Sequence, residues 1–275
     1  MSTVKTEIGY CTTERIYVRG HDLADELIGK IDFIDMIMLV ILGRRSEGNE
    51  RDMLNAILVT VTDHGLTPSA MAARLTYLGA PEAQQAAVAA GLLGAGSVFL
   101  GAMENVTLVL RHMVQSLPAS PTDANFNAAA VALCQAKREQ REAVFGLGHN
   151  IHINGDPRIP TLREVSQRNG YYGPHWRALE ALEAAASNAR GKHLPINAAG
   201  AIGAMVADMN LPATMARGLA LIGRCAGLIG HILEEQSAPI SADLWDLVLE
   251  QDPRNVRPDK RVQTRVRRLS SGQGK

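Results

Sequence analysis

The chain has 275 residues, of which 46% are hydrophobic, a share that excludes an intrinsically disordered protein. Lysine and arginine together number 28, and so do aspartate and glutamate, so no net charge favours nucleic acid or an anionic membrane as a partner. The three cysteines, Cys11, Cys134 and Cys225, are too few and too scattered for a disulfide framework or a zinc site.

Apolar residues recur at helical spacing along most of the chain, and only residues 10–19 alternate like a strand. Thr67 is a suitable N-cap, with Pro68 in the first helical turn. Predicted helices cover 23–42 with an interruption at Gly29, 50–62, 67 onward, 80 onward, 101–116, 123–143, 176–190, 197–208 and 212–235. The pattern predicts an all-α protein, and an aromatic share of only 4% agrees with close helix packing.

The chain opens without the basic and apolar pattern of a targeting segment. Its longest uncharged stretch, 83–103, consists mostly of alanine and glycine. We expect this stretch to form buried helices that break at Gly91–Gly96 rather than to span a membrane. The expected location is therefore the cytoplasm.

The charge balance hides an asymmetry at the C-terminal end. Residues 253–275 contain eight lysines and arginines and one acidic residue, Asp259. Such a tail is most often a solvated terminus. The alternatives are an arm that wraps a partner subunit or a basic contact for a phosphate.

Several polar residues stand out from this helical scaffold. His64, His149 and His231 each follow or precede a glycine at the end of a predicted helix or in the irregular segment 144–160. Loops of this kind often carry functional residues.

Two arginines occupy unusual positions. Arg158 follows Asp156-Pro157, and Arg224 lies inside the apolar stretch LALIGRCAGLIG. An arginine buried there needs an anionic partner, because an unpaired buried charge is costly. That partner is either an internal carboxylate or a substrate carboxylate held by the guanidinium group.

Other kinds of site find little support. His149 and His152 are three residues apart in a loop, but the sequence shows no third ligand nearby, so we expect no metal site. Gly94-Ala95-Gly96 lacks the spacing of a dinucleotide-binding loop. No serine stands in a nucleophile elbow.

Five segments in order resemble the citrate synthase superfamily, over about residues 19 to 235. The first resembles the family's G-x-D-L-A-x-L segment, and the last two resemble G-F-G-H-R-V-Y-K-x-x-D-P-R and A-R-x-x-G-W-x-A-H. In this chain the five segments read GHDLADELIGKIDFIDMIMLVILGRRSEGNE, TDHGLTPSAMAARL, GSVFLGAMENV, FGLGHNIHINGDPR and GRCAGLIGH.

Within this superfamily the chain is most similar to the short citryl-CoA lyase module, which also forms the C-terminal part of ATP-citrate lyase. The residues missing relative to a full synthase fall between Glu50 and His64. Phe99 stands where a synthase has a catalytic histidine, and phenylalanine also stands there in the lyase module. The sequence Asp63-His64-Gly65 also resembles the corresponding motif of the lyase module.

The resemblance implies cleavage of citryl-CoA to acetyl-CoA and oxaloacetate, with a CoA thioester as substrate and no permanently bound cofactor or metal. It assigns His64 and His149 to the keto or hydroxyl oxygen, and Arg158 and Arg224 to carboxylates. It also places Asn150 and Phe99 among the residues that bind the substrate. A histidine can polarise or deprotonate an oxygen, and an arginine neutralises a carboxylate and fixes its geometry.

Two departures from the family pattern bear on this chemistry. Ala199 stands where the family has its catalytic aspartate, in N-V-D. Alanine cannot transfer a proton, and losing one general acid or base typically costs about 10²–10⁴-fold in rate. Asn150 replaces the arginine of G-H-R, so the site offers one cationic group fewer for carboxylates.

We therefore expect a large helical domain from 1–104 and 206–252, a small one from 105–205, and a substrate cleft between them. Helices 68–103 suit close contact with a second subunit, so we expect a homodimer or larger homo-oligomer. The leading function is an enzyme that joins or cleaves an acyl-CoA and an oxo-acid. The alternatives are a catalytically impaired homologue that binds CoA or a dicarboxylate in a regulatory role, or an enzyme with an altered substrate.

Overall fold

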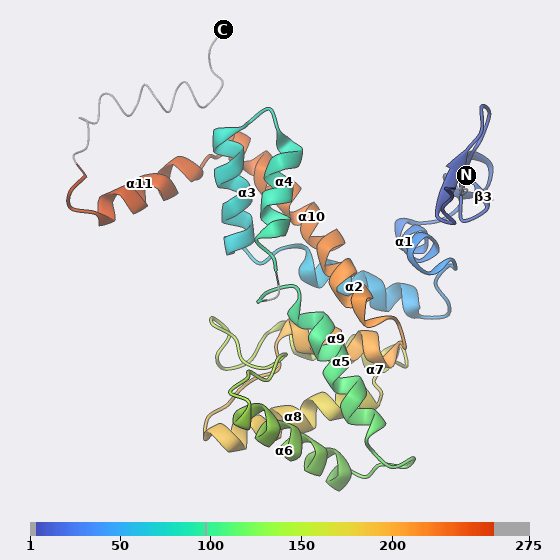
Figure 1. Ribbon diagram of the computed structural model, residues 1–275, viewed down its shortest axis with the longest axis vertical. Coiled ribbons are helices and arrows are strands. Elements are labelled where there is room, and N and C mark those ends of the chain that lie inside the picture. Colours follow the sequence, from blue (N-terminus) through green and yellow to red (C-terminus); the bar gives the residue numbers. More distant parts are fainter. Residues whose placement is uncertain (1–3, 97, 256–275) are drawn as a thin grey trace.

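The computed structural model describes residues 4–96 and 98–255. These residues are mostly helical, as Figure 1 shows, and the predicted all-α class is confirmed. The α-helices are α1 (Phe33–Leu42), α2 (Glu50–Thr62), α3 (Pro68–Gly79), α4 (Gln84–Leu93), α5 (Ala102–Gln115), α6 (Asp123–Glu139), α7 (Arg158–Arg168), α8 (Pro174–Arg190), α9 (Ala198–Asp208), α10 (Ala213–Ser237) and α11 (Ser241–Gln251).

A small antiparallel sheet precedes the helices. Its strands are β1 (Gly9–Cys11), β2 (Ile16–Val18) and β3 (His21–Asp22), in the order β1-β2-β3. The strand-like alternation at residues 10–19 is the sequence signal of the first two strands. In Figure 1 the sheet projects at one side of the molecule, next to α1 and away from α3 and α4.

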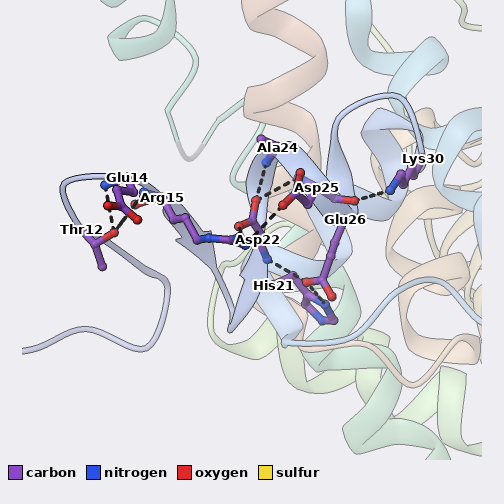
Figure 2. Close-up of polar contacts among 9 residues, drawn as sticks. All are labelled: Thr12, Glu14, Arg15, His21, Asp22, Ala24, Asp25, Glu26 and Lys30. Atoms are coloured by element: carbon purple, nitrogen blue, oxygen red, sulfur yellow. Dashed lines mark hydrogen bonds and ion pairs between the residues drawn. The ribbon is translucent and has the colours of Figure 1, made fainter.

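Asp22 connects the sheet to the helices. Its carboxylate accepts the N–H groups of Ala24 and Asp25 and so caps a single π-helical turn, η1 (Leu23–Leu27). Figure 2 shows Arg15 reaching back to Asp22, with Nη1 2.7 Å from Oδ2. The predicted helix 23–42 is thus two elements, η1 and α1, with the interruption near Gly29 where the sequence predicts it.

The start and end signals around His64 are confirmed. Helix α2 spans the predicted residues 50–62, and α3 begins at Pro68 with the Thr67 side chain accepting the N–H of Ala70. The short link between the two helices carries His64. This part of the site is therefore fixed by local sequence signals on both sides.

Two helix boundaries differ from the prediction. Helix α4 begins at Gln84 rather than near Ala80, because Ala83 has a non-helical backbone. Helix α6 ends at Glu139 rather than Ala143, and Arg141 has a φ of +57°, which no right-handed helix accommodates.

Two helices were not foreseen. Residues 144–160 were expected to be irregular, but α7 begins inside that segment, at Arg158. Its first turn lacks a side-chain cap, so it gives a weak start signal. Helix α11 follows α10 after a short break and was also missed.

Small residues in α9 let other helices approach closely. Ala201, Ile202 and Ala204 are fully buried, and Gly203 lies against α5. A Cβ at Gly203 would be 2.6 Å from Cγ1 of Val106, a separation too short for any side chain. Helix α9 is therefore a central element of the core.

Helix α10 contacts α2, α3, α4, α5 and α9. Figure 1 shows it running from the α3–α4 pair toward α9 and α5. By length and composition alone it is apolar enough to cross a membrane, but this is weak evidence because a core helix passes the same test. Its contacts with five helices are those of a core helix.

The proposed division into domains 1–104 with 206–252 and 105–205 stays a prediction. Helices α5 to α9 pack on one another in the lower part of Figure 1, but α5 and α9 also contact α10. The basic tail predicted at 253–275 lies almost entirely outside the described residues.

Gly227 supports a prediction about the α10–α2 crossing. A Cβ there would be 1.9 Å from the carbonyl oxygen of Thr62, directly before the segment that carries His64. We expect Gly227→Ala to lower the free energy of unfolding by about 1–3 kcal/mol or more, because backbone must move.

The matched control is Gly218→Ala on the same helix, where nothing lies within 4 Å of an added Cβ. Alanine favours helix by about 1 kcal/mol over glycine, so this control should be neutral or stabilising. Urea unfolding of both variants checks the pair. Equal stabilities would contradict the close crossing.

Candidate active site

The loop that carries His149 is tied to the start of α9 by three hydrogen bonds. Gly148 N–H donates to the Pro195 carbonyl at 2.7 Å, and Asn197 N–H donates to the Gly146 carbonyl at 3.0 Å. The Asn197 side-chain amide also donates to the Gly148 carbonyl at 2.8 Å. These bonds place His149 beside the first turn of α9, which contains Ala199.

Close backbone approach explains the glycines of this loop. Gly146 has a φ of +87°, and a Cβ on Gly200 would lie 2.4 Å from the Gly146 carbonyl oxygen. Only glycine fits both positions without a shift of the backbone.

Three histidines converge at this point. The ring centroids of His64 and His149 are 5.4 Å apart, those of His64 and His152 are 5.5 Å apart, and those of His149 and His152 are 4.5 Å apart. The Nε2 atoms of His64 and His152 are within hydrogen-bond distance, at 3.2 Å. The fold thus joins the end of α2 to the irregular loop before α7.

Hydrogen bonds determine the tautomer of His149. Its Nδ1 accepts the backbone N–H groups of Ile151 and His152, each at 3.0 Å. The neutral ring therefore carries its proton on Nε2. Burial, and next the charge of His152, lowers the pKa of His149. The ring can donate its Nε2–H to an oxygen atom of a ligand.

The pKa of His64 is lowered in the same way. Burial is the main cause, and the positive charge of Arg158 adds to it. Both histidines that the resemblance singles out therefore favour the neutral form, which can accept a proton as well as donate one.

The expectation that no third ligand lies near His149 and His152 is wrong. His64 supplies it from a distant part of the chain, and one ligand atom from each ring lies within 4.8 Å of the other two. The tautomer of His149 still disfavours a metal ion, because its Nδ1 faces two N–H groups and its Nε2 carries the proton. Two nearby guanidinium groups also repel a cation.

Arg158 has the internal partner that the sequence left open. Its Nε and Nη2 donate to the two oxygens of Asp156 at 2.9 and 2.7 Å. Asp156 also accepts the N–H of Ala198, so the pair is anchored to α9. Burial raises the pKa of Asp156, but the hydrogen bonds and charge of Arg158 and the hydrogen bond from Ala198 act together in the other direction, and the pKa is lowered. Nη1 of Arg158 takes no part in the pair.

Arg224 differs from Arg158. It is only 7% exposed, and among the described residues its Nη1 has no hydrogen-bond partner. No carboxylate of the described chain lies within ion-pair distance of it. Burial lowers its pKa, and the more distant charges of Asp63 and Arg158 act on it in opposite directions. The charge of Arg224 also contributes, less than burial and the charge of Arg158, to the lowered pKa of His64.

The remaining predicted site residues are less constrained. Phe99, in the turn before α5, is 46% exposed and has no ring contact with the histidines among the described residues. Asn150 is exposed, directly after His149. Ala199 is partly buried against the core. The structure tests none of their assigned roles.

Asp208, the next acidic residue along α9, cannot replace a carboxylate at position 199. It accepts the N–H groups of Gly173, His175 and Trp176 and so caps the start of α8. Its carboxylate is occupied by these hydrogen bonds, at the end of α9 opposite to Ala199. His152 is the one member of the cluster that the sequence did not assign, because its contact with His64 depends on the fold.

Comparison with known proteins gives a consistent family. The family model "Citrate synthase, C-terminal domain" matches residues 34–242. A Mycobacterium tuberculosis protein provisionally named citrate synthase 2 is 26% identical over 222 residues, which are 72% of this chain and 56% of that protein. The chain thus spans about half the length of that relative.

Solved structures agree with this match. Citryl-CoA lyase from Hydrogenobacter thermophilus is 30% identical, with a TM-score of 0.75 over 86% of this chain and 88% of that chain. ATP citrate lyase from Methanosaeta concilii, an aspartate-to-alanine variant in complex with (3S)-citryl-CoA, is 20% identical with a TM-score of 0.74. The match covers 96% of this chain and 43% of the ATP citrate lyase chain, and it shows that the two share the fold.

The unpaired Arg224 predicts that its replacement affects ligands more than folding. Arg224→Met keeps most of the side-chain volume and removes an uncompensated buried charge. We expect an unchanged or higher melting temperature, and a loss of affinity for a small dicarboxylate probe of about tenfold to a hundredfold, the value of a charge-assisted hydrogen bond. Calorimetry and thermal unfolding measure the two effects.

Arg74→Met is the matched control. Arg74 is 1% exposed and pairs with buried Glu235 at 2.7 Å. Removing it strands that carboxylate and should cost about 3–5 kcal/mol of stability. A comparable loss of stability in Arg224→Met, with ligand affinity retained, would mean that Arg224 serves an internal partner.

The lowered pKa values of His64 and His149 predict a pH dependence of stability. At pH values near the ordinary histidine pKa, the unfolded chain binds protons that these folded rings do not. Their contribution to the free energy of unfolding is therefore complete above that pKa and falls as the pH drops through it.

Urea unfolding at about pH 7.5 and about pH 5.5 measures this dependence. The wild type should lose more stability between the two than the double variant His64→Asn, His149→Asn. An identical loss in both proteins would show that neither ring has a lowered pKa.

Proposed function

Because the chain belongs to the citrate synthase family, we propose that it binds a citrate-like substrate and makes or breaks a carbon–carbon bond between an acyl-CoA and an oxo-acid. The leading reaction is the cleavage of citryl-CoA to acetyl-CoA and oxaloacetate. The observation that carries this proposal is the buried Nη1 of Arg224, which has no hydrogen-bond partner within residues 4–96 and 98–255. The lowered pKa values of His64 and His149 support it, because they favour neutral rings that can act on an oxygen atom. A carboxylate of the substrate supplies the missing anion.

The site residues divide the work of a retro-aldol step. The substrate hydroxyl gives its proton to a base, its oxygen forms a carbonyl group, and the electrons of the broken carbon–carbon bond pass to the thioester enolate. We assign the base to His64 and a hydrogen bond to the same oxygen to the Nε2–H of His149. Arg224 and the Nη1 of Arg158 hold carboxylates. The enolate carbon must then receive a proton.

The family's donor of that last proton is replaced in this chain, because the resemblance places Ala199 where the family's aspartate stands. Two carboxylates of the described site, those of Asp156 and Asp63, are engaged in other hydrogen bonds. Asp156 pairs with Arg158, and Asp63 accepts hydrogen bonds from His231 and Gly65. This observation favours the alternative of a homologue that binds a CoA thioester or dicarboxylate and turns it over slowly or not at all, in a regulatory role.

Exposed Asn150 leaves a third possibility, an enzyme with an altered substrate. Its side-chain amide can form a hydrogen bond with a carbonyl or hydroxyl group, where the family's arginine binds a carboxylate. Substrates with one carboxylate fewer would then bind as well as citryl-CoA does.

We also propose a homodimer or larger homo-oligomer located in the cytoplasm. Leu93 and Val98, near the end of α4 and before α5, are 84% and 79% exposed. Leu233 on α10 is 54% exposed. These side chains are apolar and suit the subunit contact expected for helices 68–103.

Incubation of the full chain with citryl-CoA tests the proposed function. Release of acetyl-CoA and oxaloacetate in the presence of EDTA is the expected result for an active lyase that needs no metal. Binding of citryl-CoA without release would favour the regulatory homologue. If citryl-CoA is neither bound nor cleaved, both the active lyase and the regulatory homologue are refuted. Turnover of a thioester with fewer carboxylates would favour the enzyme with an altered substrate.

Ala199→Asp tests the assignment of the missing carboxylate. If position 199 faces the reacting carbon, the aspartate supplies the proton that the enolate needs, and cleavage should become about 10²–10⁴-fold faster. Ala199→Asn is the control, because it matches the aspartate in size but cannot transfer a proton.

Circular dichroism checks that both variants fold, since an unpaired aspartate packed against the core would destabilise the protein. Rates of citryl-CoA cleavage are compared among the three proteins. A folded aspartate variant without any gain, beside a wild type that already cleaves quickly, would show that another group protonates the enolate.

A further inference from the structure

A continuous hydrogen-bonded chain leads from the protein interior to the segment that carries His64. It begins at Arg74 on α3, which is 1% exposed. Arg74 Nη1 donates to Glu235 at 2.7 Å, and its Nε donates to Nδ1 of His231 at 3.1 Å. His231 in turn lies 2.8 Å from Asp63, the residue before His64. No part of the proposed chemistry uses Arg74, Glu235 or His231.

The arginine fixes the tautomer of His231. A guanidinium group can only donate, and both Nε and Nη2 of Arg74 lie within 3.1 Å of Nδ1 of His231. That nitrogen is therefore without a proton. The neutral ring carries its proton on Nε2 and donates it to Oδ1 of Asp63.

Asp63 connects His231 to the turn that contains His64. Its second oxygen, Oδ2, accepts the N–H of Gly65 at 2.9 Å. This hydrogen bond joins the residue before His64 to the residue after it. Burial raises the pKa of Asp63, but the hydrogen bonds from Gly65 and His231, the charge of His231 and the backbone of His64 act together in the other direction, and the pKa is lowered. The carboxylate is thus ionised and held at both oxygens.

The buried end of this hydrogen-bonded network, at Arg74 and Glu235, is also held by several hydrogen bonds. Oε1 of Glu235 accepts the N–H groups of Ile240 and Ser241, at 2.9 and 2.8 Å, where α11 begins. Glu234 is a second acceptor for Arg74. The network therefore joins α3, α10 and α11 before it reaches the end of α2.

We propose that His231 is a positioning residue for His64, acting through Asp63 to hold the imidazole of His64 in the half-buried position next to His149, His152 and Arg158. Without the Nε2–H of His231, one oxygen of Asp63 is released and the turn gains freedom. The value of this positioning for turnover rests on the proposed function, but the position of His64 does not.

Two amide variants separate positioning from simple structural support. The oxygen of His231→Asn lies near the former Nδ1 and accepts from Arg74, but its side chain is too short to reach Asp63. The amide of His231→Gln lies near the former Nε2 and donates to Asp63, while Arg74 keeps its two glutamates. The first variant breaks the link to His64, and the second retains it.

The readout is the titration of His64, followed by NMR on histidine-labelled full-length protein and assigned with His64→Asn. The groups that act on this ring are Arg158, His152, Asp156 and Arg224. In His231→Asn we expect the His64 midpoint to shift upward toward the ordinary histidine value, because the ring gains water and the released Asp63 favours its cation. His231→Gln should keep the wild-type midpoint.

A folded His231→Asn variant with an unchanged His64 midpoint would overturn the proposal, and so would an equal shift in His231→Gln. If His231→Asn does not fold, the nitrogen spectrum of the wild type decides, because the proposal requires a proton on Nε2 of His231 and none on Nδ1. Affinity for oxaloacetate, measured separately, should fall about tenfold in His231→Asn. A lack of oxaloacetate binding by the wild type would refute the proposed function and leave the titration test intact.

Discussion

A buried guanidinium group requires an anion, and this requirement organises the site. Arg74 meets it inside the protein, with Glu235 and Glu234 as partners. Arg158 meets it with Asp156. Arg224 is buried on the same helix as both glutamates, yet its Nη1 faces no acceptor among the described residues. In the proposed function, a ligand carboxylate supplies the missing anion and offsets the cost of that unpaired charge.

The histidines complement this cationic site because they stay neutral. Burial and the neighbouring arginines lower the pKa of His64, and two backbone N–H groups fix the proton of His149 on Nε2. Under the proposed function, the arginines hold carboxylates, and the neutral histidines act on an oxygen and its proton. If Ala199 occupies the position of the family's aspartate, as the resemblance implies, the proposed reaction lacks that acid on the carbon side. Ligand binding by Arg224 does not depend on this acid.

Much of this was predictable from local sequence signals. The helix end and start signals around His64, the apolar stretch around Arg224 and each family segment by itself depend on residues close together in the chain. The internal partner of Arg158 was also within reach, because Asp156 is only two residues away. The His64–His152 contact and the Arg74–His231–Asp63 chain were not predictable, since each joins residues 88 or more positions apart. Helix α7 was missed because its start lacks a cap.

A crystal structure of the full chain with oxaloacetate would test the central claim most directly. The account predicts a carboxylate oxygen at about 2.7–2.9 Å from Nη1 of Arg224, the usual length of a charge-assisted hydrogen bond, and the keto oxygen next to Nε2 of His149. The contrary result would be an Nη1 atom paired with a protein carboxylate or with water alone, while oxaloacetate at saturating concentration binds elsewhere or not at all.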